Sequence, residues 1–308
     1  MTTAAPAPRT TSPGAAVAMV LGAAVSVQVG ATAASALFPS VGAVGAAALR
    51  LLLAALVMAV AVRPRVLRWT RRQLLLSAAF GAVLAAMNTS FYAALTHIPL
   101  GVAVTCEFLG PLTLSALLTR RRRDLVWVVL ALAGVVVLGL GGDGEGGALE
   151  PVGVLLALVA GACWAGYVLL SARVGAAVPG QGGLAVASVV AGALVLPLGA
   201  ATAGADLLHA HVLLLGLAAA VMSSVLPYSL ELVALRRLPE RTFGVLLSLE
   251  PAIAALVGWL LLSQGLPLTS VLAIAVVVVA SAGATAAASR GQVPADPGLA
   301  THARPLDG

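Results

Sequence analysis

Three ionisable side chains lie deep inside apolar stretches of this sequence: Arg50, Glu107 and Glu250. A charged group at the middle of a bilayer costs about 2.5–3.5 kcal/mol on insertion scales, so such groups are rare and usually serve a purpose. One purpose is a structural ion pair that holds helices together. The other is a site that binds a charged substrate or carries a proton. The sequence leaves both open and favours the second.

Two prolines stand beside the carboxylates. Pro111 follows Glu107 by four residues and lacks the N–H that the Glu107 carbonyl would accept, and Pro251 does the same to the carbonyl of Leu247. In lipid, a broken helix is tolerated only where protein or a wet cavity satisfies the freed groups. We therefore expect breaks at Pro111 and Pro251 that face inward, with the carboxylate and freed carbonyl of Glu107 at one place. Helix kinking alone would explain the prolines but not the adjacent carboxylates.

Polar residues recur at helical spacing in several apolar runs, which places them on one face of each helix. Hydrogen bonding between helices is the simpler explanation of any single stripe. Several stripes together with three deep charges predict one hydrated cavity. The stripes are Gln28, Thr32 and Ser35; Asn88 and Tyr92; Trp164 and Tyr167; and Ser224, Tyr228 and Glu231. Glu231 lies near the cytoplasmic end of its run, where it could also reach the interface.

The elements that position these residues must be membrane-spanning helices. The 308 residues are 61% hydrophobic and 9% charged, too little charge to cover a water-soluble domain. The apolar sequence is divided into runs of about 20 residues, the length that crosses a bilayer. We predict ten transmembrane helices, at 14–37, 41–62, 73–94, 99–119, 124–141, 151–171, 181–203, 210–232, 241–262 and 267–288.

The charges between these runs predict the orientation. The net charge is +6 and every basic residue is Arg, a composition typical of GC-rich bacterial genes. Sixteen of the seventeen arginines fall in alternate loops or in the tails, whereas the loop 142–150 on the other side is acidic. This pattern orients a membrane protein and does not indicate a nucleic-acid partner, so both termini are expected in the cytoplasm. Residues 1–13 and 289–308 are expected to be disordered tails.

A repeat occurs at an offset of 140 residues. Leu95-Thr-His-Ile-Pro99 aligns with Leu235-Arg-Arg-Leu-Pro239, and Pro111 aligns with Pro251 without a gap. Because the offset spans five helices, the second half must enter the membrane upside down. The fold class predicted is thus all-α, with two inverted five-helix repeats at 14–141 and 151–288 and a substrate site where they meet. Convergent Leu-Pro turns are the rival explanation.

At this point the sequence resembles a known family. Residues 226–262, LPYSLELVALRRLPERTFGVLLSLEPAIAALVGWLLL, are similar to the second half of EamA-type transporters of the drug/metabolite transporter superfamily, especially the threonine/homoserine exporter branch. IPLGVAVTCEFLGPL (98–112), ALRLLLAAL (48–56) and VWVVLALAGVVVL (126–138) extend the likeness to the first half. The resemblance implies ten helices, location in the bacterial inner membrane and proton-coupled export of small metabolites such as amino acids. One departure is Ser263-Gln264, where the family commonly has Gly-Glu.

The mechanism expected is alternating access around the central cavity. A zwitterionic amino acid would place its carboxylate near Arg50 and its ammonium near Glu107 or Glu250. The side-chain pocket would be closed by aromatic groups, with Asn88 adding a polar contact; the aromatic candidates are Tyr92, Trp164 and Tyr228. Glu107 and Glu250 are the candidates for proton coupling, although Arg50 would hold either one charged. The partners expected are the substrate, protons and the bilayer, with a homodimer left open.

Other function classes are less well supported. Multidrug efflux on the same scaffold is the main alternative, and the low aromatic content (4%) argues mildly against it. A non-transporting structural or sensory membrane protein is the alternative of another class. An intramembrane enzyme would need a nucleophile and a base, yet the histidines lie at helix ends or in the tail, and neither G-x-S-x-G nor H-E-x-x-H occurs. No cofactor is expected, and neither metal-ligand spacing nor a disulfide framework is present.

Overall fold

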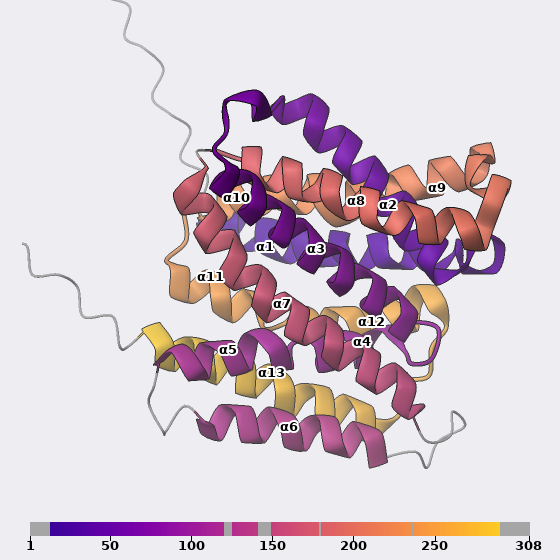
Figure 1. Cartoon of the computed structure of the whole chain (residues 1–308). Helices are drawn as coiled ribbons and strands as arrows, with labels where there is room; N and C mark the ends of the chain where they lie inside the picture. Colours follow the sequence, from indigo (N-terminus) through magenta and orange to yellow (C-terminus); the bar gives the residue numbers. More distant parts are fainter. Residues whose placement is uncertain (1–12, 120–124, 141–148, 179, 236, 290–308) are drawn as a thin grey trace, which may run out of the picture.

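A computed structural model describes residues 13–119, 125–140, 149–178, 180–235 and 237–289, all of whose regular elements are helices (Figure 1). The predicted tails, apart from Pro13 and Ser289, lie outside these residues. The α-helices are α1 (Pro13–Ser35), α2 (Phe38–Val62), α3 (Arg71–Ala94), α4 (Leu100–Glu107), α5 (Leu109–Thr119), α6 (Leu125–Leu140), α7 (Pro151–Ala177), α8 (Gly182–Ala203), α9 (Ala210–Ala220), α10 (Leu226–Leu235), α11 (Glu240–Leu247), α12 (Glu250–Leu262) and α13 (Leu268–Ser289). Short 3-10 helices occupy Val66–Arg68 and Gly204–Leu208.

Each of the ten predicted spans corresponds to a helix or to consecutive helices. Eight described helical stretches are long and apolar enough to cross a membrane, and two shorter apolar ones lie at 125–137 and 210–225. Three of the predicted spans are not regular α-helices, and two of them are the spans in which Pro111 and Pro251 predicted a break. The span 99–119 is interrupted between α4 and α5, 241–262 is interrupted between α11 and α12, and 210–232 contains a π-helical turn, η4 (Val221–Val225), between α9 and α10.

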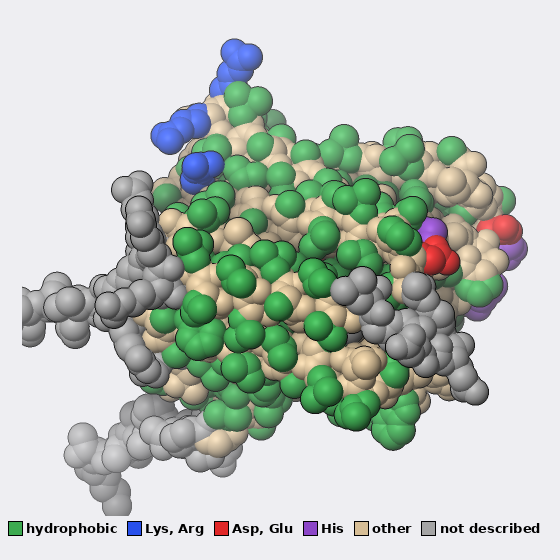
Figure 2. All heavy atoms as spheres, turned by 90° about the horizontal axis from the view of Figure 1, so that it is seen from below, with side chains coloured by type: hydrophobic (Ala, Val, Ile, Leu, Met, Phe, Trp, Pro, Cys, Tyr) green, Lys and Arg blue, Asp and Glu red, His purple; other side chains and the backbone are tan. Residues whose placement is uncertain are grey.

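The two ends of the helix bundle carry different charges. In Figure 2, Arg side chains lie at one end, Asp, Glu and His side chains lie at the other, and hydrophobic side chains cover the surface between them. We call the first the basic end (Arg63, Arg65, Arg68, Arg71, Arg72, Arg173 and Arg237) and the second the acidic end (His97, Glu150, Asp206, His209 and His211). An apolar belt between two polar ends is the surface expected of a protein that spans a bilayer.

Small residues let the helices pack closely, as is usual between membrane helices. The most extensive packing joins α2 to α8, α3 to both α7 and α8, and α6 to α13. A Cβ on Gly81 of α3 would lie 2.5 Å from the Ala187 carbonyl oxygen of α8, and one on Gly199 of α8 would lie 2.5 Å from the Ala48 Cβ of α2. No larger side chain fits at either crossing unless the helices separate.

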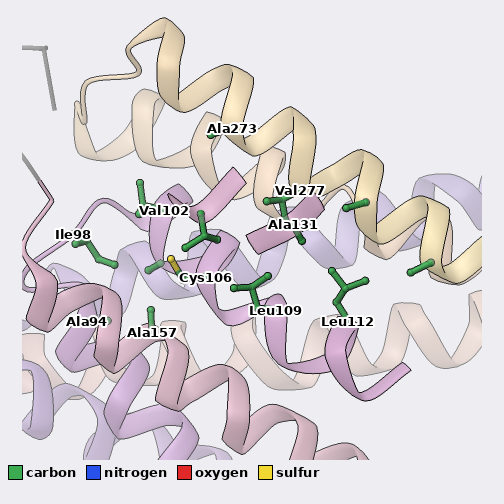
Figure 3. Packing of buried hydrophobic residues seen from close by; sticks show 14 residues of the cluster. Ala94, Ile98, Val102, Cys106, Leu109, Leu112, Ala131, Ala157, Ala273 and Val277 are labelled. Atoms are coloured by element: carbon green, nitrogen blue, oxygen red, sulfur yellow. The ribbon is translucent and has the colours of Figure 1, made fainter. Parts of the chain in front are cut away.

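A hydrophobic cluster surrounds the α4–α5 interruption. Val102, Cys106, Leu109 and Leu112 belong to one buried cluster with Ala131 of α6 and Val277 of α13, seen in Figure 3. The face of α4–α5 that carries these residues is therefore apolar and sealed. Glu107, which lies between Cys106 and Leu109 in sequence, is directed away from this cluster and lines the cavity described next.

Candidate functional site

A cavity of about 350 Å³ lies inside the bundle, between helices from both halves of the chain. Its lining contains residues from α1, α2, α3, α4, α7, α8, η4, α10, α11 and α12. The structure brings six of the seven predicted substrate-binding residues together around it: Arg50, Asn88, Tyr92, Glu107, Trp164 and Glu250. The seventh, Tyr228, lies on α10, and its side chain is not among those that the structure describes.

Arg50 supplies the positive charge of the cavity. It is half-buried on α2, and its Cζ lies 5.3 Å from the centroid of the Tyr92 ring, within the range of a cation–π contact. Its Nε is buried and has no hydrogen-bond partner among the described residues. A guanidinium presents several donors in one plane and binds carboxylates in a bidentate manner. A buried donor without a partner beside a cavity is therefore suited to receive the carboxylate of a ligand.

Tyr92 and Asn88 place aromatic and polar surface next to Arg50. Tyr92 is 2% exposed, and its ring meets that of Phe38 edge to face with 6.2 Å between centroids. Phe38 begins α2, so this contact fixes the ring over which Arg50 lies. Asn88, one turn earlier on α3, donates from Nδ2 to the Leu84 carbonyl at 2.8 Å. That bond orients the amide while its remaining polar atoms add to the lining.

Three carboxylates share the cavity with this single arginine among the described lining residues. Glu107 is the last residue of α4, Glu250 is the first of α12, and Glu231 lies on α10. Glu107 interacts electrostatically with Glu250 and with Arg50, and Glu250 interacts with Glu231. The carboxylates therefore form a connected series. With all four groups ionised, these side chains would give the cavity a net negative charge.

The ion pair considered from the sequence is absent from this conformation. No carboxylate oxygen of Glu107, Glu231 or Glu250 lies within 4.0 Å of an Arg50 nitrogen. Arg50 and the carboxylates face the same space but do not neutralise one another directly. A buried charge without a partner of opposite sign is costly. A ligand that carries one charge of each sign could pair with Arg50 and with a carboxylate at the same time.

The interruption after Glu107 has a different consequence from the one predicted. The Glu107 carbonyl was expected to be available beside its carboxylate, but it faces α7: a Cβ on Gly161 would lie 2.5 Å from the Glu107 oxygen. A Cβ on Gly110 would also overlap the Gly161 carbonyl. The carbonyl that Pro111 leaves without an amide partner thus lies in a close helix crossing. Of the two groups at Glu107, only the carboxylate side chain is left for the cavity.

The second interruption presents Glu250 at a helix N-terminus. Glu250 is 9% exposed and lies in the first turn of α12, where the unpaired amides and the helix dipole favour a negative charge. Pro251 follows in the first turn, a position at which the missing N–H costs nothing. The two interruptions therefore differ. One ends a helix at a carboxylate, and the other begins a helix with one.

The crossing at Gly161 gives a test of stability. Replacing Gly110 with Ala should lower the free energy of unfolding by about 2 kcal/mol or more, because the added methyl overpacks a backbone contact. Gly175 offers a matched control on α7, since a Cβ there would meet no atom within 4 Å. Gly175→Ala should leave stability unchanged or raise it by up to about 1 kcal/mol. Denaturation of both purified variants in detergent measures the difference; equal stability would contradict the close crossing.

Aromatic rings form part of the cavity wall. Trp164 of α7 meets Phe108 edge to face, with 5.0 Å between ring centroids. Tyr167, one turn later, contacts Phe80, with 4.9 Å between the two ring centroids. Phe108 lies in the interruption between α4 and α5, so this ring contact joins the interruption to α7. An apolar wall opposite a few charged groups is the usual construction of a small-molecule site.

Two members of the predicted polar stripes, Gln28 and Ser224, also line the cavity. Other lining residues were not singled out from the sequence. Ser188 lies fourteen residues from Thr202, the other hydroxyl residue of α8, and Ser223 is one position out of register with the stripe of Ser224, so neither was part of a predicted stripe. The apolar contributors Met58, Met87, Phe91 and Phe108 carry no sequence signal that separates them from ordinary core residues. Within the described residues, no group of three His, Cys, Asp or Glu side chains could hold a metal ion.

Comparison with known proteins places this arrangement in context. Residues 151–286 match the EamA-like transporter family. The chain is 45% identical over 261 residues to the threonine/homoserine exporter RhtA of Salmonella typhimurium strain LT2, covering 84% of this chain and 88% of that protein. It is 44% identical over 270 residues to RhtA of Escherichia coli strain K12, covering 87% and 90%. A crystal structure of a protein with 20% identity shares the fold, with a TM-score of 0.58 over 92% of this chain and 100% of the other.

Proposed function

Because the chain belongs to the EamA-like transporter family, we propose that it exports threonine and homoserine across a bacterial inner membrane. The relatives that carry this activity in their names are 44–45% identical over most of their length. The observation in this chain that carries the proposal is the cavity, which is lined by one guanidinium and by three carboxylates that form no ion pair with it. A small amino acid carries one charge of each sign and fits that arrangement.

The size and lining of the cavity agree with a small zwitterion. Its volume of about 350 Å³ is near the lower end of the range for ligand pockets. The substrate carboxylate would accept hydrogen bonds from Arg50, and its ammonium would lie between Glu107 and Glu250. The hydroxyl that threonine and homoserine share would face Asn88 or a serine of the wall. Tyr92 and Trp164 would exclude water from one side of the bound amino acid.

The architecture we propose is a pair of inverted five-helix repeats, 14–141 and 151–288. The helix packing supports it. The offset of 140 residues makes α1 equivalent to α7, α3 to α9–α10, and α4–α5 to α11–α12. In agreement with this, α7 packs on α3 and on α4–α5, and α1 packs on α9–α10 and on α11–α12. The pairs α2–α8 and α6–α13 join equivalent helices of the two halves and would lie across the pseudo-two-fold axis. Such repeats allow one scaffold to open alternately to either side of the membrane.

The described conformation supports access from the cytoplasm. Three half-buried lining residues lie toward the basic end: Met58 of α2, Leu184 of α8 and Glu231 of α10. Toward the acidic end the lining includes Tyr92, which lies two residues before the end of α3 and is only 2% exposed. By the positive-inside rule the basic end is cytoplasmic, so the chain's described first and last residues, at that same end in Figure 1, are cytoplasmic too. An exporter must load its substrate from that side.

Proton coupling follows from the charge of the cavity. Three carboxylates and one guanidinium leave an excess of negative charge, which a net-neutral amino acid does not remove. Protonation of Glu107 or Glu250 from the outer side would lower the repulsion between them when the substrate has left. Return of that proton to the cytoplasm would restore the charge that attracts the next ammonium. The cycle exchanges one substrate outward for protons inward.

Transport in everted membrane vesicles tests this function. With an acidic interior, vesicles that contain the protein should accumulate labelled threonine and homoserine at least about tenfold over vesicles without it, and a protonophore should abolish the accumulation. Leucine should accumulate less, because it lacks the hydroxyl. Accumulation unchanged by the protonophore would remove proton coupling. Transport of hydrophobic cations with no transport of either amino acid would replace the proposal with multidrug efflux.

A further inference from the structure

The N-terminus of α4 is held by a residue from the opposite half of the chain. The Leu100 amide donates to the Gln264 Oε1 at 3.0 Å, although the two residues are 164 positions apart. The first amides of a helix lack partners within it, and Pro99, which precedes α4, has no side-chain acceptor to offer. Gln264 therefore supplies the cap that α4 lacks, and it does so from the turn that follows α12.

The same region contains a close helix contact. A Cβ on Gly101 of α4 would lie 2.6 Å from both the Cα and the Cβ of Ala255 on α12. A Cβ on Gly258 would lie 2.5 Å from the Gln264 Oε1, so only glycine leaves room for the amide. Ser263 has a left-handed φ of 52°, which turns the chain back toward α4, and the Gln264 amide donates to the Gly258 carbonyl at 3.2 Å.

This contact closes the acidic end of the cavity. Leu100 is 0% exposed and Val257 is 6% exposed; with Val104, Phe108, Ala254 and Ala31 they form one buried cluster. α4 leads from that cluster to Glu107 at its other end, and α12 begins with Glu250. The two helices joined by Gln264 are thus the two that carry the proposed proton-binding carboxylates. Access from the outer side requires α4 and α12 to separate here.

We propose that Gln264 is the latch of the outer gate, holding α4 against α12 while the cavity faces the cytoplasm. The inference rests on the transport function proposed above and adds a positioning residue to it. Because an amide does not titrate, the latch itself is independent of pH. A second contact nearby, His97 Nδ1 to Glu150 Oε2 at 2.6 Å, joins the turn before α4 to the start of α7, but both side chains are partly exposed and contribute less.

Accessibility of a single cysteine tests the latch. In a background with Cys106 and Cys163 replaced by Ala, Ala31→Cys places a thiol beneath the gate, and a membrane-impermeant thiol reagent is applied to the outside of intact cells. Loss of a helix cap shifts an equilibrium by about fivefold, so Gln264→Leu should raise the labelling rate by about that factor. Gln264→Glu should label at the original rate, because a carboxylate also accepts from a helix N-terminus.

Gly258→Ala is a second variant that leaves Gln264 in place but displaces its amide, and it should label as Gln264→Leu does. The latch is contradicted if both variants label at the original rate, or if Gln264→Glu labels as fast as Gln264→Leu. Labelling needs no substrate, so threonine efflux measured in the same cells separates the two proposals. Absent efflux with the expected labelling would count against the substrate and not against the latch. Thermal unfolding of each variant confirms that it folds.

Discussion

Replacing Glu250 with Gln is expected to lower proton-driven efflux of threonine and homoserine by about two orders of magnitude. The substitution keeps the size and the hydrogen-bonding capacity of the side chain but removes its charge. A buried charge that pairs with a ligand charge contributes about 2–5 kcal/mol when one partner is lost, which corresponds to a factor of about 30 or more. Glu107→Gln should act in the same direction, because Glu107 and Glu250 interact across the same space.

Glu150→Gln is the matched control for both variants. Glu150 undergoes the same chemical change, but its side chain is 63% exposed at the acidic end, outside the cavity. Its substitution should leave efflux within about twofold of the original rate, because exposed ion pairs contribute little. Initial rates in everted vesicles, corrected for the amount of folded protein, measure all three. Unchanged efflux in both Glu250→Gln and Glu107→Gln would remove these carboxylates from the mechanism.

Replacing Arg50 with Gln is expected to raise the KM for threonine by about 100-fold, with a smaller effect on the maximal rate. The guanidinium is the only described cation in the cavity lining, and its Nε finds no hydrogen-bond partner in the part of the chain that the structure describes. A ligand carboxylate that forms charge-assisted hydrogen bonds there loses most of its anchor when the charge is removed. Arg50→Lys should recover part of the affinity, because an ammonium keeps the charge without the planar pair of donors.

Tyr92 and Arg173 provide the controls for this prediction. Tyr92→Phe keeps the ring over which the Arg50 Cζ lies at 5.3 Å, so it should change the KM less than Tyr92→Leu does. Arg173 is exposed on α7 toward the basic end, and Arg173→Gln should leave the KM unchanged. Concentration dependence of uptake gives the KM of each variant. An Arg50→Gln protein with the original KM would show that the substrate carboxylate binds elsewhere.

The positions of the helices followed from the sequence because the bilayer imposes simple rules on it. Runs of about 20 apolar residues and arginines in alternate loops located the helices and the basic end. In two of the predicted spans, 99–119 and 241–262, Pro111 and Pro251 also indicated that the helix would be interrupted. The π-turn Val221–Val225 contains no proline or glycine, but Pro227 follows it and has no N–H for the carbonyl of Ser223, a local signal that the sequence prediction did not use.

The site was predictable only where a residue type is costly in lipid. Arg50, Glu107 and Glu250 stood out because charges are rare in apolar runs, and the structure places all three around one cavity. Ser188 and Phe108 did not stand out, since a single serine or phenylalanine is common in a membrane helix. The contact of the Glu107 carbonyl with Gly161 and the bond from Leu100 to Gln264 depend on residues distant in sequence. Such contacts are set by packing and have no local pattern.

The central claim is that the cavity recognises both charges of an amino acid at once. Competition by two threonine analogues tests it directly: the methyl ester, which lacks the carboxylate, and the deaminated hydroxy acid, which lacks the ammonium. The account predicts that an excess of unlabelled threonine or homoserine blocks uptake of labelled threonine into everted vesicles, whereas neither analogue does so at a tenfold higher concentration. Equal inhibition by either analogue would contradict it, because the corresponding charge of the substrate would then have no partner in the site.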